Sequence, residues 1–417
     1  MLTIYRILIN ITLILSPLII FFRLIKKKED FKRFKEKFCF FSKKRKKGKV
    51  IWFHGASVGE IQSIIPLLEK FEKNKKIDQI LITSNTLSSS KIISKINLKK
   101  VVHQFFPIDV KFISKKFLNY WNPSAAFFID SEVWPNMILN LKKKRIPVVL
   151  INGRITRKSF VRWKFFNKFA KKIFGKFDLC FSSNTETLYF LKKLGAKKIV
   201  TVGNLKFSQS EKKFEEFNTN LKKFIKSKKV WCASSTHFNE EKLCGLVHKE
   251  LKQRYKNLLT IIIPRHVNRT QSIKENLCNL GLKVHTHEPQ SKILNNTDIY
   301  LVNAYGKTKS FYNYCKCVFL GGSIINRGGQ NPLEAARFGC KILHGPNISN
   351  FKEIYKFLHN NKISNKITSS KMMSNTLIKL FLKNNNSNKV KGKINNIGQK
   401  ILNVTYKEIN LLLKNEI

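Results

Sequence analysis

The sequence predicts an α/β protein of two doubly wound, Rossmann-like domains that face each other across a cleft, preceded by an apolar N-terminal helix. Three observations support this prediction. Short apolar runs alternate with longer amphipathic ones, glycine and other small residues follow several of these runs, and the chain begins with an almost wholly apolar stretch. Apolar strands that alternate with helices are typical of βαβ units and a parallel sheet. A chain of 417 residues suits two domains of roughly 100–200 residues each.

Twelve apolar runs are predicted to be buried strands, six on each side of a polar, lysine-rich segment. Most are separated by stretches with a helical pattern. The first six are Val50–His54, Gln79–Thr83, Val101–Phe106, Ala125–Ile129, Pro147–Ile151 and Asp178–Ser182, and the second six are Lys229–Ala233, Leu259–Ile263, Leu282–His285, Asp298–Val302, Cys317–Leu320 and Cys340–Leu343.

The changes in pattern set the predicted domain boundaries. Residues 383–391 are rich in Asn, Lys and Ser and are expected to form a mobile loop before a last helix. The predicted parts are a membrane anchor (1–25), an N-terminal acceptor-binding domain (26–205), a linker (206–228), a C-terminal nucleotide-binding domain (229–393) and a C-terminal helix (394–417).

The N-terminal stretch Ile4–Phe22 is predicted to be a membrane anchor. Its length is close to the roughly 20 residues that a spanning helix needs. Arg23 and Lys26–Lys28 follow at once, so the rest of the chain is expected on the cytoplasmic side. A cleaved signal peptide would end in small residues, which this stretch does not. Arg6 and Pro17 interrupt the run, which leaves open whether the helix spans the bilayer or lies in its interface.

The charge and the cysteines narrow the classes of partner. The net charge is +55, with 80 Lys and Arg against 25 Asp and Glu, which favours an anionic membrane surface or phosphorylated substrates. Abundant Lys, Asn, Ile and Phe also fit the bias of an AT-rich genome. No segment interleaves basic and aromatic residues as nucleic-acid-binding segments do, so nucleic acid is not a predicted partner. The eight cysteines contain no CxxC pair, which argues against a zinc or disulfide framework and fits the cytoplasm.

The strongest motif is the glycine-rich run from Gly321 to Glu334. A predicted strand ends in two glycines, Gly328 and Gly329 follow in a short loop, and Asn331 precedes a proline that opens a helix. Glycines let a backbone approach a phosphate, and free N–H groups at a helix start bind its charge. The alternative is an ordinary tight turn between strand and helix. The clustering of glycines favours a phosphate site, with Glu334 as a helix cap or a ribose acceptor.

The second motif, His54–Glu60, is a strand that runs into a loop of small residues and then a helix. Ser57 and Gly59 let a ligand approach the backbone, and Glu60 falls near the helix start. A carboxylate there is equally a candidate general base or a capping acid.

The third motif, Asp130–Asn136, places two acids at the end of a predicted strand, before Trp-Pro. Asp-x-Glu suggests a metal site, but a metal usually needs more oxygen ligands than this segment supplies. A structural or acceptor-orienting role for Glu132 is therefore favoured.

Three smaller groups are candidates for an anion site, each equally explained by a plain loop role. Ser235 lies among hydroxyl residues after the first strand of the second half, where they could hold phosphate or cap a helix. Arg265 and His266 end the next strand, and the planar guanidinium of arginine suits phosphate and carboxylate. Lys206 lies at the expected domain boundary, where it could reach a ligand in the cleft.

Taken together, these segments resemble the Kdo (3-deoxy-D-manno-octulosonic acid) transferases of lipopolysaccharide synthesis. The resemblance covers nearly the whole chain, and the motifs occur in the family's order. They are His54 to Glu60, Ser131 to Asn136, Asn152-Gly153-Arg154, Gly203 to Phe207, Pro264-Arg265-His266, and Gly321 to Glu334.

The resemblance implies an enzyme of the two-domain GT-B type that transfers Kdo, with inversion, from CMP-Kdo to the lipid A precursor (lipid IVA) at the bacterial inner membrane. It implies no cofactor and no metal. Glu60 is the implied base, with Glu132, Ser57 and Gly59 in support. The implied donor-binding residues are Lys206, Ser235, Arg265, His266, Gly322, Gly328, Gly329, Asn331 and Glu334.

Three places depart from the family's pattern. Gln330 stands where many members have histidine, Lys307-Thr308 stands where an acidic residue is expected, and Asn152-Gly153-Arg154 differs at its middle position. The alternatives are another GT-B enzyme that uses a nucleoside-diphosphate sugar and a non-catalytic membrane-bound binding protein. Retention of Glu60 and of Gly328–Glu334 argues against the second.

Overall fold

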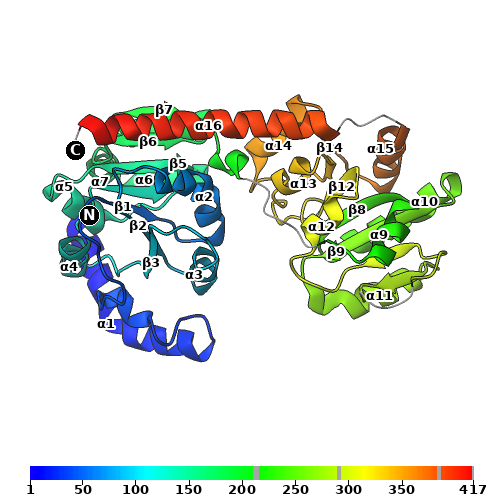
Figure 1. Cartoon of the computed structure of the whole chain (residues 1–417), viewed down its shortest axis with the longest axis horizontal. Coiled ribbons are helices and arrows are strands. Elements are labelled where there is room, and N and C mark those ends of the chain that lie inside the picture. The colour runs from blue at the N-terminus through cyan, green and yellow to red at the C-terminus, as the bar shows by residue number, and fades with distance from the viewer. Residues whose placement is uncertain (210–215, 289–292, 383–386, 416–417) are drawn as a thin grey trace. The chain divides into compact units, whose positions relative to one another are not determined.

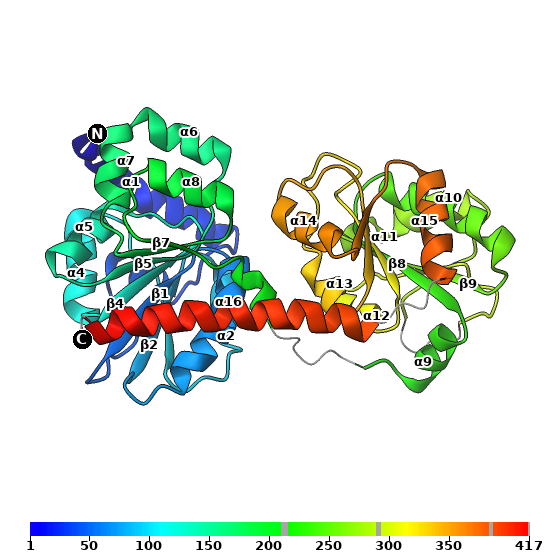
Figure 2. The same ribbon diagram turned by 90° about the horizontal axis from the view of Figure 1, so that it is seen from above.

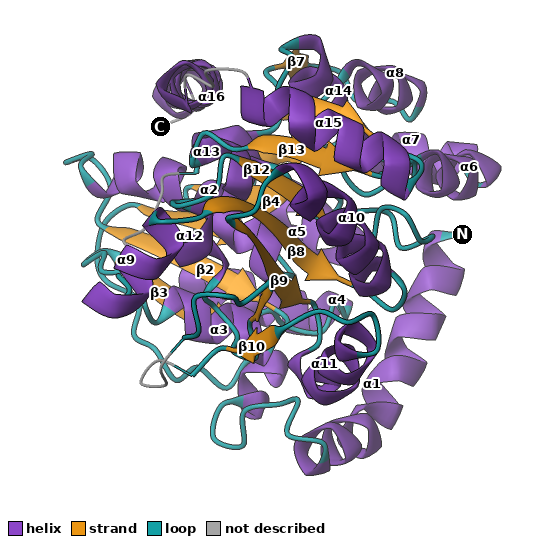
Figure 3. Ribbon diagram, turned by 90° about the vertical axis from the view of Figure 1, so that its right-hand side faces the viewer, coloured by secondary structure: helices purple, strands orange, loops and turns teal. Residues whose placement is uncertain are grey.

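Two parallel seven-stranded sheets form the framework of this chain, as the sequence predicts (Figure 1). The computed structural model describes residues 1–209, 216–288, 293–382 and 387–415. Residues 1–210 together with 397–417 form one compact unit, and residues 211–396 form the second. Helices cover both faces of the sheets (Figure 2 and Figure 3).

The sheet of the first unit has the strand order β3-β2-β1-β4-β5-β6-β7. Its strands are β1 (Val50–His54), β2 (Gln79–Ser84), β3 (Val101–Phe105), β4 (Ala125–Ile129), β5 (Val148–Gly153), β6 (Leu179–Ser182) and β7 (Ile199–Thr201). The described helices of this unit are α1 (Leu2–Ile25), η1 (Phe34–Phe38), α2 (Val58–Glu72), α3 (Leu87–Ile93), α4 (Lys111–Trp121), α5 (Pro135–Lys143), α6 (Arg157–Phe165), α7 (Asn167–Phe174), α8 (Thr185–Lys193) and η2 (Leu205–Ser208).

The sheet of the second unit has the order β10-β11-β9-β8-β12-β13-β14. Its strands are β8 (Lys229–Thr236), β9 (Leu258–Pro264), β10 (Val284–Thr286), β11 (Ile299–Leu301), β12 (Cys317–Leu320), β13 (Lys341–His344) and β14 (Ser364–Lys366). Its described helices are α9 (Thr219–Lys226), α10 (Glu240–Arg254), η3 (Val267–Arg269), α11 (Thr270–Cys278), α12 (Thr308–Tyr312), α13 (Leu333–Arg337), α14 (Lys352–Asn360) and α15 (Ser370–Leu382).

The strand order locates where each sheet can bind a ligand. The central strands are buried along their length, as expected for parallel strands covered on both faces. In the first sheet the order reverses between β1 and β4, and in the second it reverses between β8 and β12. Ligands of doubly wound sheets bind beyond the carboxyl ends of the strands at such a reversal. The loops after these four strands are therefore the first places to look for a site.

The last helix departs from its prediction. Helix α16 runs over Ser387–Asn415 and begins before the expected residue 394, so residues 387–391 are helical rather than a loop. The remaining residues of that expected loop, 383–386, lie outside the described part. Val390 and Ile394 are buried, and the burial of one apolar face outweighs the weak helix propensity of the Asn, Ser and Lys around them. From Ile397 onward α16 belongs to the first unit, where Tyr406 packs on Phe71 of α2 with ring centroids 5.0 Å apart.

The segment expected to be a linker, residues 206–228, contains most of η2 and all of α9. Two edge strands, β7 and β14, are absent from the prediction. Each has only three residues, so neither shows a recognisable apolar run.

Helix α1 is long and apolar enough to cross a membrane by length and composition. Its first turns are held on the first unit by two polar contacts. Tyr5 Oη donates to Asp109 Oδ2 at 2.6 Å, and Arg6 Nε donates to Asn136 Oδ1 at 3.0 Å. Arg6, which interrupts the apolar pattern in the sequence, thus has a partner on α5.

Candidate active site

The first unit gathers acidic side chains where its strand order reverses. Glu60 comes from the first turn of α2, the helix that follows β1, and Asp130 and Glu132 come from the loop after β4. Each of the other two acids raises the pKa of the Glu60 carboxyl through its negative charge, so the three lie close enough to interact. The strand order brings together two motifs that the sequence predicts separately.

Glu60 is held in a fixed position at the start of α2. Ser57 is the N-cap, and its Oγ accepts from the Glu60 N–H. The Glu60 carboxylate in turn accepts from Ser57 Oγ at 2.7 Å and from the Ala56 N–H at 2.7 Å. This reciprocal pattern is a capping box. The sequence leaves general base and helix cap as alternative roles for Glu60, but this geometry lets one residue have both roles. A Cβ added at Gly59, the residue before Glu60, would meet no heavy atom within 4 Å, so the space at Gly59 is open.

The pKa of Glu60 is raised to about 7. Burial is the largest cause, and the charges of Glu132 and Asp130 add to it, while the hydrogen bond from Ser57 opposes it. A carboxylate with a pKa near neutrality is matched to accepting a proton at neutral pH.

Glu132 is fixed by two aromatic neighbours. Trp134 Nε1 donates to Glu132 Oε2 at 2.9 Å and lies 3.1 Å from His54 Nε2. His54 is fully buried at the end of β1, and its Nδ1 lies 2.9 Å from Thr83 Oγ1. Burial lowers the pKa of His54, so its imidazole is neutral. The ring supports Glu132 without placing a positive charge beside it. His54 and Trp134 belong to segments that the sequence singles out, but their mutual contact depends on the pairing of distant strands.

Lys206 lies beside these acids, next to two polar residues whose backbones are strained. Asp130 and Asn152 both have left-handed backbones, with φ of 56° and 54°. Asn152 Nδ2 donates to Asp130 Oδ1 at 2.5 Å, and Asn152 Oδ1 accepts from the Leu205 N–H at 2.9 Å. Burial raises the pKa of Asp130, while the charge of Lys206 lowers it. Strained backbone of this kind concentrates at functional sites. Lys206 therefore lies with the acidic cluster of the first unit, and not on a linker.

In the second unit, the start of the glycine-rich run binds the carboxylate of Glu240, a residue of the same unit. Glu240 at the start of α10 accepts from the N–H groups of Gly322 (2.7 Å), Ser323 (3.2 Å), Ile324 (3.1 Å) and His237 (3.0 Å). Glu240 is 1% exposed. The N–H groups directly after β12 thus bind an internal carboxylate. The predicted phosphate site at the helix start after Asn331 stays a prediction.

Cationic and imidazole groups lie beside that loop. Arg265 and His266, which follow β9, are exposed. The rings of His237 and His266 are 5.8 Å apart, and burial, followed by the charges of His266 and Arg327, lowers the pKa of His237. Arg269 is paired bidentately with Glu241 at 3.1 and 3.2 Å. Arg269 is therefore engaged by Glu241, whereas Arg265 is exposed and lies close enough to His237 to affect its charge. A phosphate-binding role for Arg265 stays a prediction.

The other residues that are predicted to bind the donor substrate surround this loop. Ser235 has a left-handed backbone, with φ of 56°, where β8 shifts its register against β9. Gly322, Gly328 and Gly329 all have positive φ, which accounts for glycine at these positions. Asn331 Oδ1 accepts from the Leu333 N–H at 3.2 Å and so starts α13. Glu334 lies 3.6 Å from Lys309, where it could still accept from a ribose hydroxyl.

Comparison with known proteins agrees with this arrangement. Residues 32–209 match the family described as 3-deoxy-D-manno-octulosonic-acid transferase (kdotransferase). The chain is 33% identical over 374 residues to the 3-deoxy-D-manno-octulosonic acid transferase of Rickettsia bellii, which covers 89% of each chain. It is 26% identical over 315 residues to the Haemophilus influenzae protein of that name, covering 74% of this chain and 73% of the other. The UDP-GlcNAc 2-epimerase of Neisseria meningitidis is 16% identical, with a TM-score of 0.59, and covers 88% of this chain and 100% of that one, which shows a shared fold.

Two doubly wound units, each with polar groups at the reversal of its strand order, define a protein of the GT-B class. Within that class the chain belongs to the Kdo transferase family. It is a glycosyltransferase of lipopolysaccharide biosynthesis, and the resemblance seen in the sequence is confirmed.

Proposed function

We propose that this enzyme transfers Kdo from CMP-Kdo to the lipid A precursor, lipid IVA, with inversion at the anomeric carbon. The observation that carries the proposal is the Glu60 carboxylate, which is fixed by two hydrogen bonds and has a pKa of about 7. Family membership supports the choice of sugar.

The proposed reaction is a single displacement. Glu60 takes the proton from an acceptor hydroxyl as its oxygen attacks the anomeric carbon of Kdo. The bond from that carbon to the phosphate oxygen of CMP breaks, and CMP leaves as a phosphate monoester. One displacement inverts the centre. Arg265 stabilises the negative charge on the leaving phosphate, because a guanidinium donates two parallel hydrogen bonds to such a group.

The remaining predicted residues have supporting roles in this proposal. Glu132, held by Trp134, orients the acceptor, and Ser57 and Gly59 shape the base's surroundings. Lys206 offsets the charge of Asp130. Ser235, His266, Gly322, Gly328, Gly329, Asn331 and Glu334 bind the CMP-sugar.

The apolar helix α1 supports a location at the inner membrane, with both units on the cytoplasmic side. Lys26, Lys27 and Lys28 follow the helix directly. An anionic membrane surface attracts such a basic segment, and the lipid acceptor is present in the same membrane.

The direct test is reconstitution. Detergent-solubilised enzyme is incubated with a CMP-Kdo-generating system and lipid IVA, and the products are measured by mass spectrometry. A mass increase of one or more Kdo units is expected. CMP should inhibit and UDP should not. Inhibition by UDP alone would instead support a nucleoside-diphosphate sugar donor, and failure of both nucleotides to bind would support a non-catalytic protein.

The transfer rate is expected to fall as pH decreases through about 7. The raised pKa of Glu60 means that its carboxyl becomes protonated near neutrality rather than near pH 4.5, and a protonated carboxyl cannot act as a base. The acid limb of kcat/KM against pH measures this pKa. Ser57→Ala removes a hydrogen bond that lowers the pKa, so the limb should move to higher pH. A limb near pH 4.5 in the wild type would contradict the assignment.

Arg265→Ala is expected to weaken CMP binding by about tenfold to a hundredfold, since hydrogen bonds to charged groups contribute about 1.5–3 kcal/mol. Calorimetric titration with CMP measures the effect. Arg254→Ala removes the same charge from an exposed position at the end of α10 and should change the affinity by less than about twofold. Equal losses of CMP affinity in the two variants would mean that Arg265 contributes only to the general positive charge of the protein.

A further inference from the structure

A second polar site lies in the first unit, between α3 and the edge strand β3. A cavity of about 290 Å³ is lined by Arg33, Lys43, Ser90, Ile93, Ser94, Ile96, Val101, Val102 and His103. Among these described lining residues two are cationic and none is acidic. Its volume is near the lower end of the range for small-molecule sites, roughly 300 Å³.

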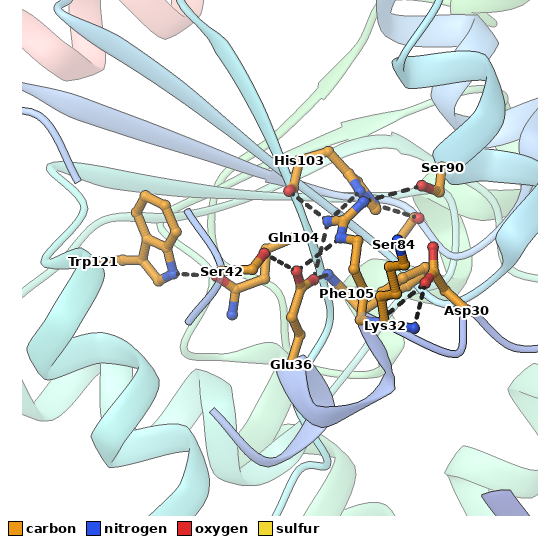
Figure 4. Close-up of polar contacts among 11 residues, drawn as sticks. Asp30, Lys32, Glu36, Ser42, Ser84, Ser90, His103, Gln104, Phe105 and Trp121 are labelled. Carbon is orange, nitrogen blue, oxygen red and sulfur yellow. Dashed lines mark hydrogen bonds and ion pairs between the residues drawn. The ribbon is translucent and has the colours of Figure 1, made fainter. Parts of the chain in front are cut away.

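Buried hydrogen bonds fix the guanidinium of Arg33 at this cavity. Arg33 is paired with Glu36 through Nε at 2.8 Å and Nη2 at 3.0 Å, and Nη2 also donates to the His103 carbonyl at 2.8 Å. Glu36 is 1% exposed and also accepts from the Phe105 N–H and from Ser42 Oγ. Figure 4 shows Glu36, Ser42, Ser90, His103 and Phe105 within this network. Glu36 does not line the cavity, but its carboxylate offsets the charge of Arg33 while it fixes the guanidinium at the lining.

Hydrogen-bond donors that face the cavity remain available to a ligand after this network is formed. Arg33 Nη1 makes one long contact, 3.4 Å to Ser90 Oγ, and Ser90 accepts there, so its O–H can donate elsewhere. Ser90 and His103 are each 8% exposed. His103 Nδ1 faces Arg33 Nη2 at 3.1 Å and therefore accepts, and its Nε2 lies 2.9 Å from Ser84 Oγ. Burial and the charges of Arg33 and Lys43 lower the pKa of His103 to about 3, so the ring stays neutral. The lining thus combines a guanidinium that is ion-paired on one side, the ammonium of the exposed Lys43 and a buried hydroxyl donor.

The apolar part of the lining and its place in the chain indicate the kind of anion. Ile93, Ile96 and Val101 give one side of the cavity a hydrocarbon surface, which an inorganic ion does not need. Glu29, 6% exposed, connects the basic end of α1 to η1, since its Oε1 is 2.6 Å from Arg23 Nε and 2.5 Å from Lys37 Nζ. The cavity residues that flank η1 are therefore connected to the basic end of the apolar helix, and basic residues that follow an apolar helix are typical of the level of lipid headgroups.

We propose that this cavity binds the phosphate of an anionic phospholipid, with Arg33, Lys43 and Ser90 as the donors and the isoleucines against the glycerol and first acyl carbons. This site is separate from the acceptor chemistry at Glu60, and its occupation does not depend on the proposed reaction.

The test titrates the full chain, in dodecyl maltoside, with dihexanoyl-phosphatidylglycerol in a calorimeter. Lys43→Glu is expected to weaken binding at least about tenfold, because it replaces an attractive charge in the lining with a repulsive one. Lys44→Glu is the matched control. It makes the same change of charge at the next, exposed residue, which does not line the cavity, and should weaken binding less than about twofold.

A second pair of variants tests shape instead of charge. Ser94→Trp places a ring in the cavity from its exposed rim and should abolish binding, whereas Asn97→Trp, exposed and outside the lining, should not. Melting followed by circular dichroism checks that all four variants are folded. Dihexanoyl-phosphatidylcholine should bind more weakly than phosphatidylglycerol.

Two results would overturn the proposal. Equal losses for Lys43→Glu and Lys44→Glu, with no effect of Ser94→Trp, would mean that lipid binds only through the general positive charge. Inorganic phosphate that binds as tightly as the lipid, with the same dependence on Lys43, would assign the cavity to a soluble phosphate compound and not to a lipid.

Discussion

Replacing Glu60 with glutamine is expected to lower kcat for Kdo transfer about a thousandfold, within the range that general-base catalysis contributes. Glutamine can still accept the Ala56 N–H and can still complete the capping box, so the start of α2 should remain intact. What the variant loses is the ability to accept a proton. The KM for CMP-Kdo should stay within about threefold, because the change removes an interaction made in the transition state.

The comparison for this variant is Glu69→Gln, an exposed acid on the same helix, which should leave kcat unchanged. Initial rates from mass spectrometry of the lipid product give both constants. A Glu60→Gln enzyme that retains more than a tenth of the wild-type kcat would show that another group takes the proton, and Glu132 would be the next to test.

Replacing Glu240 with glutamine is expected to loosen the glycine-rich loop and to speed amide exchange at Gly322–Ile324 about a hundredfold. The carboxylate accepts from four backbone N–H groups, whereas an amide offers one oxygen and turns its NH2 toward donors. A buried N–H without an acceptor costs about 1–3 kcal/mol, and about 1.4 kcal/mol is a factor of ten. CMP affinity should fall as well, because His237 and Gly322 would no longer be held together.

Hydrogen–deuterium exchange of peptides that cover residues 319–326 measures this effect. The matched variant is Glu241→Gln, the next residue of α10, which loses the pair with Arg269 but no contact to the loop. It should change exchange at Gly322–Ile324 by less than about threefold. The Glu240 account fails if both variants change that loop equally.

Much of the fold is predictable because parallel strands buried on both faces are unbroken apolar runs. Val50–His54, Ala125–Ile129 and Cys317–Leu320 match their strands at both ends. The short edge strands β7 and β14 carry no such signal. The early start of α16 is hard to predict from the sequence because its first turn is polar. Only the buried Val390 and Ile394 mark the face that packs.

The candidate residues are predictable one motif at a time, but their partners are not. Glu240 binds N–H groups 82 to 84 residues away, and no local pattern marks a carboxylate for such a distant loop. The polar residues that follow Lys206 predict a linker that begins there, whereas residues up to 210 belong to the first unit, where Asn152 of β5 accepts from the Leu205 N–H. The Ser57–Glu60 spacing alone is that of a capping box, a local pattern that is compatible with a base role.

The first unit is assembled from two separate stretches of the chain, and this affects the order of events during synthesis. Residues 211–396 form a unit from one continuous stretch that is complete before the ribosome reaches Ile397. The first unit instead waits for the final stretch, because Tyr406 covers Phe71 and Gly398 packs against the Phe207 carbonyl. Although it emerges first, the part that carries Glu60 is therefore the last to be completed. Until then, Phe71 and its neighbours on α2 remain an uncovered apolar surface in the nascent chain.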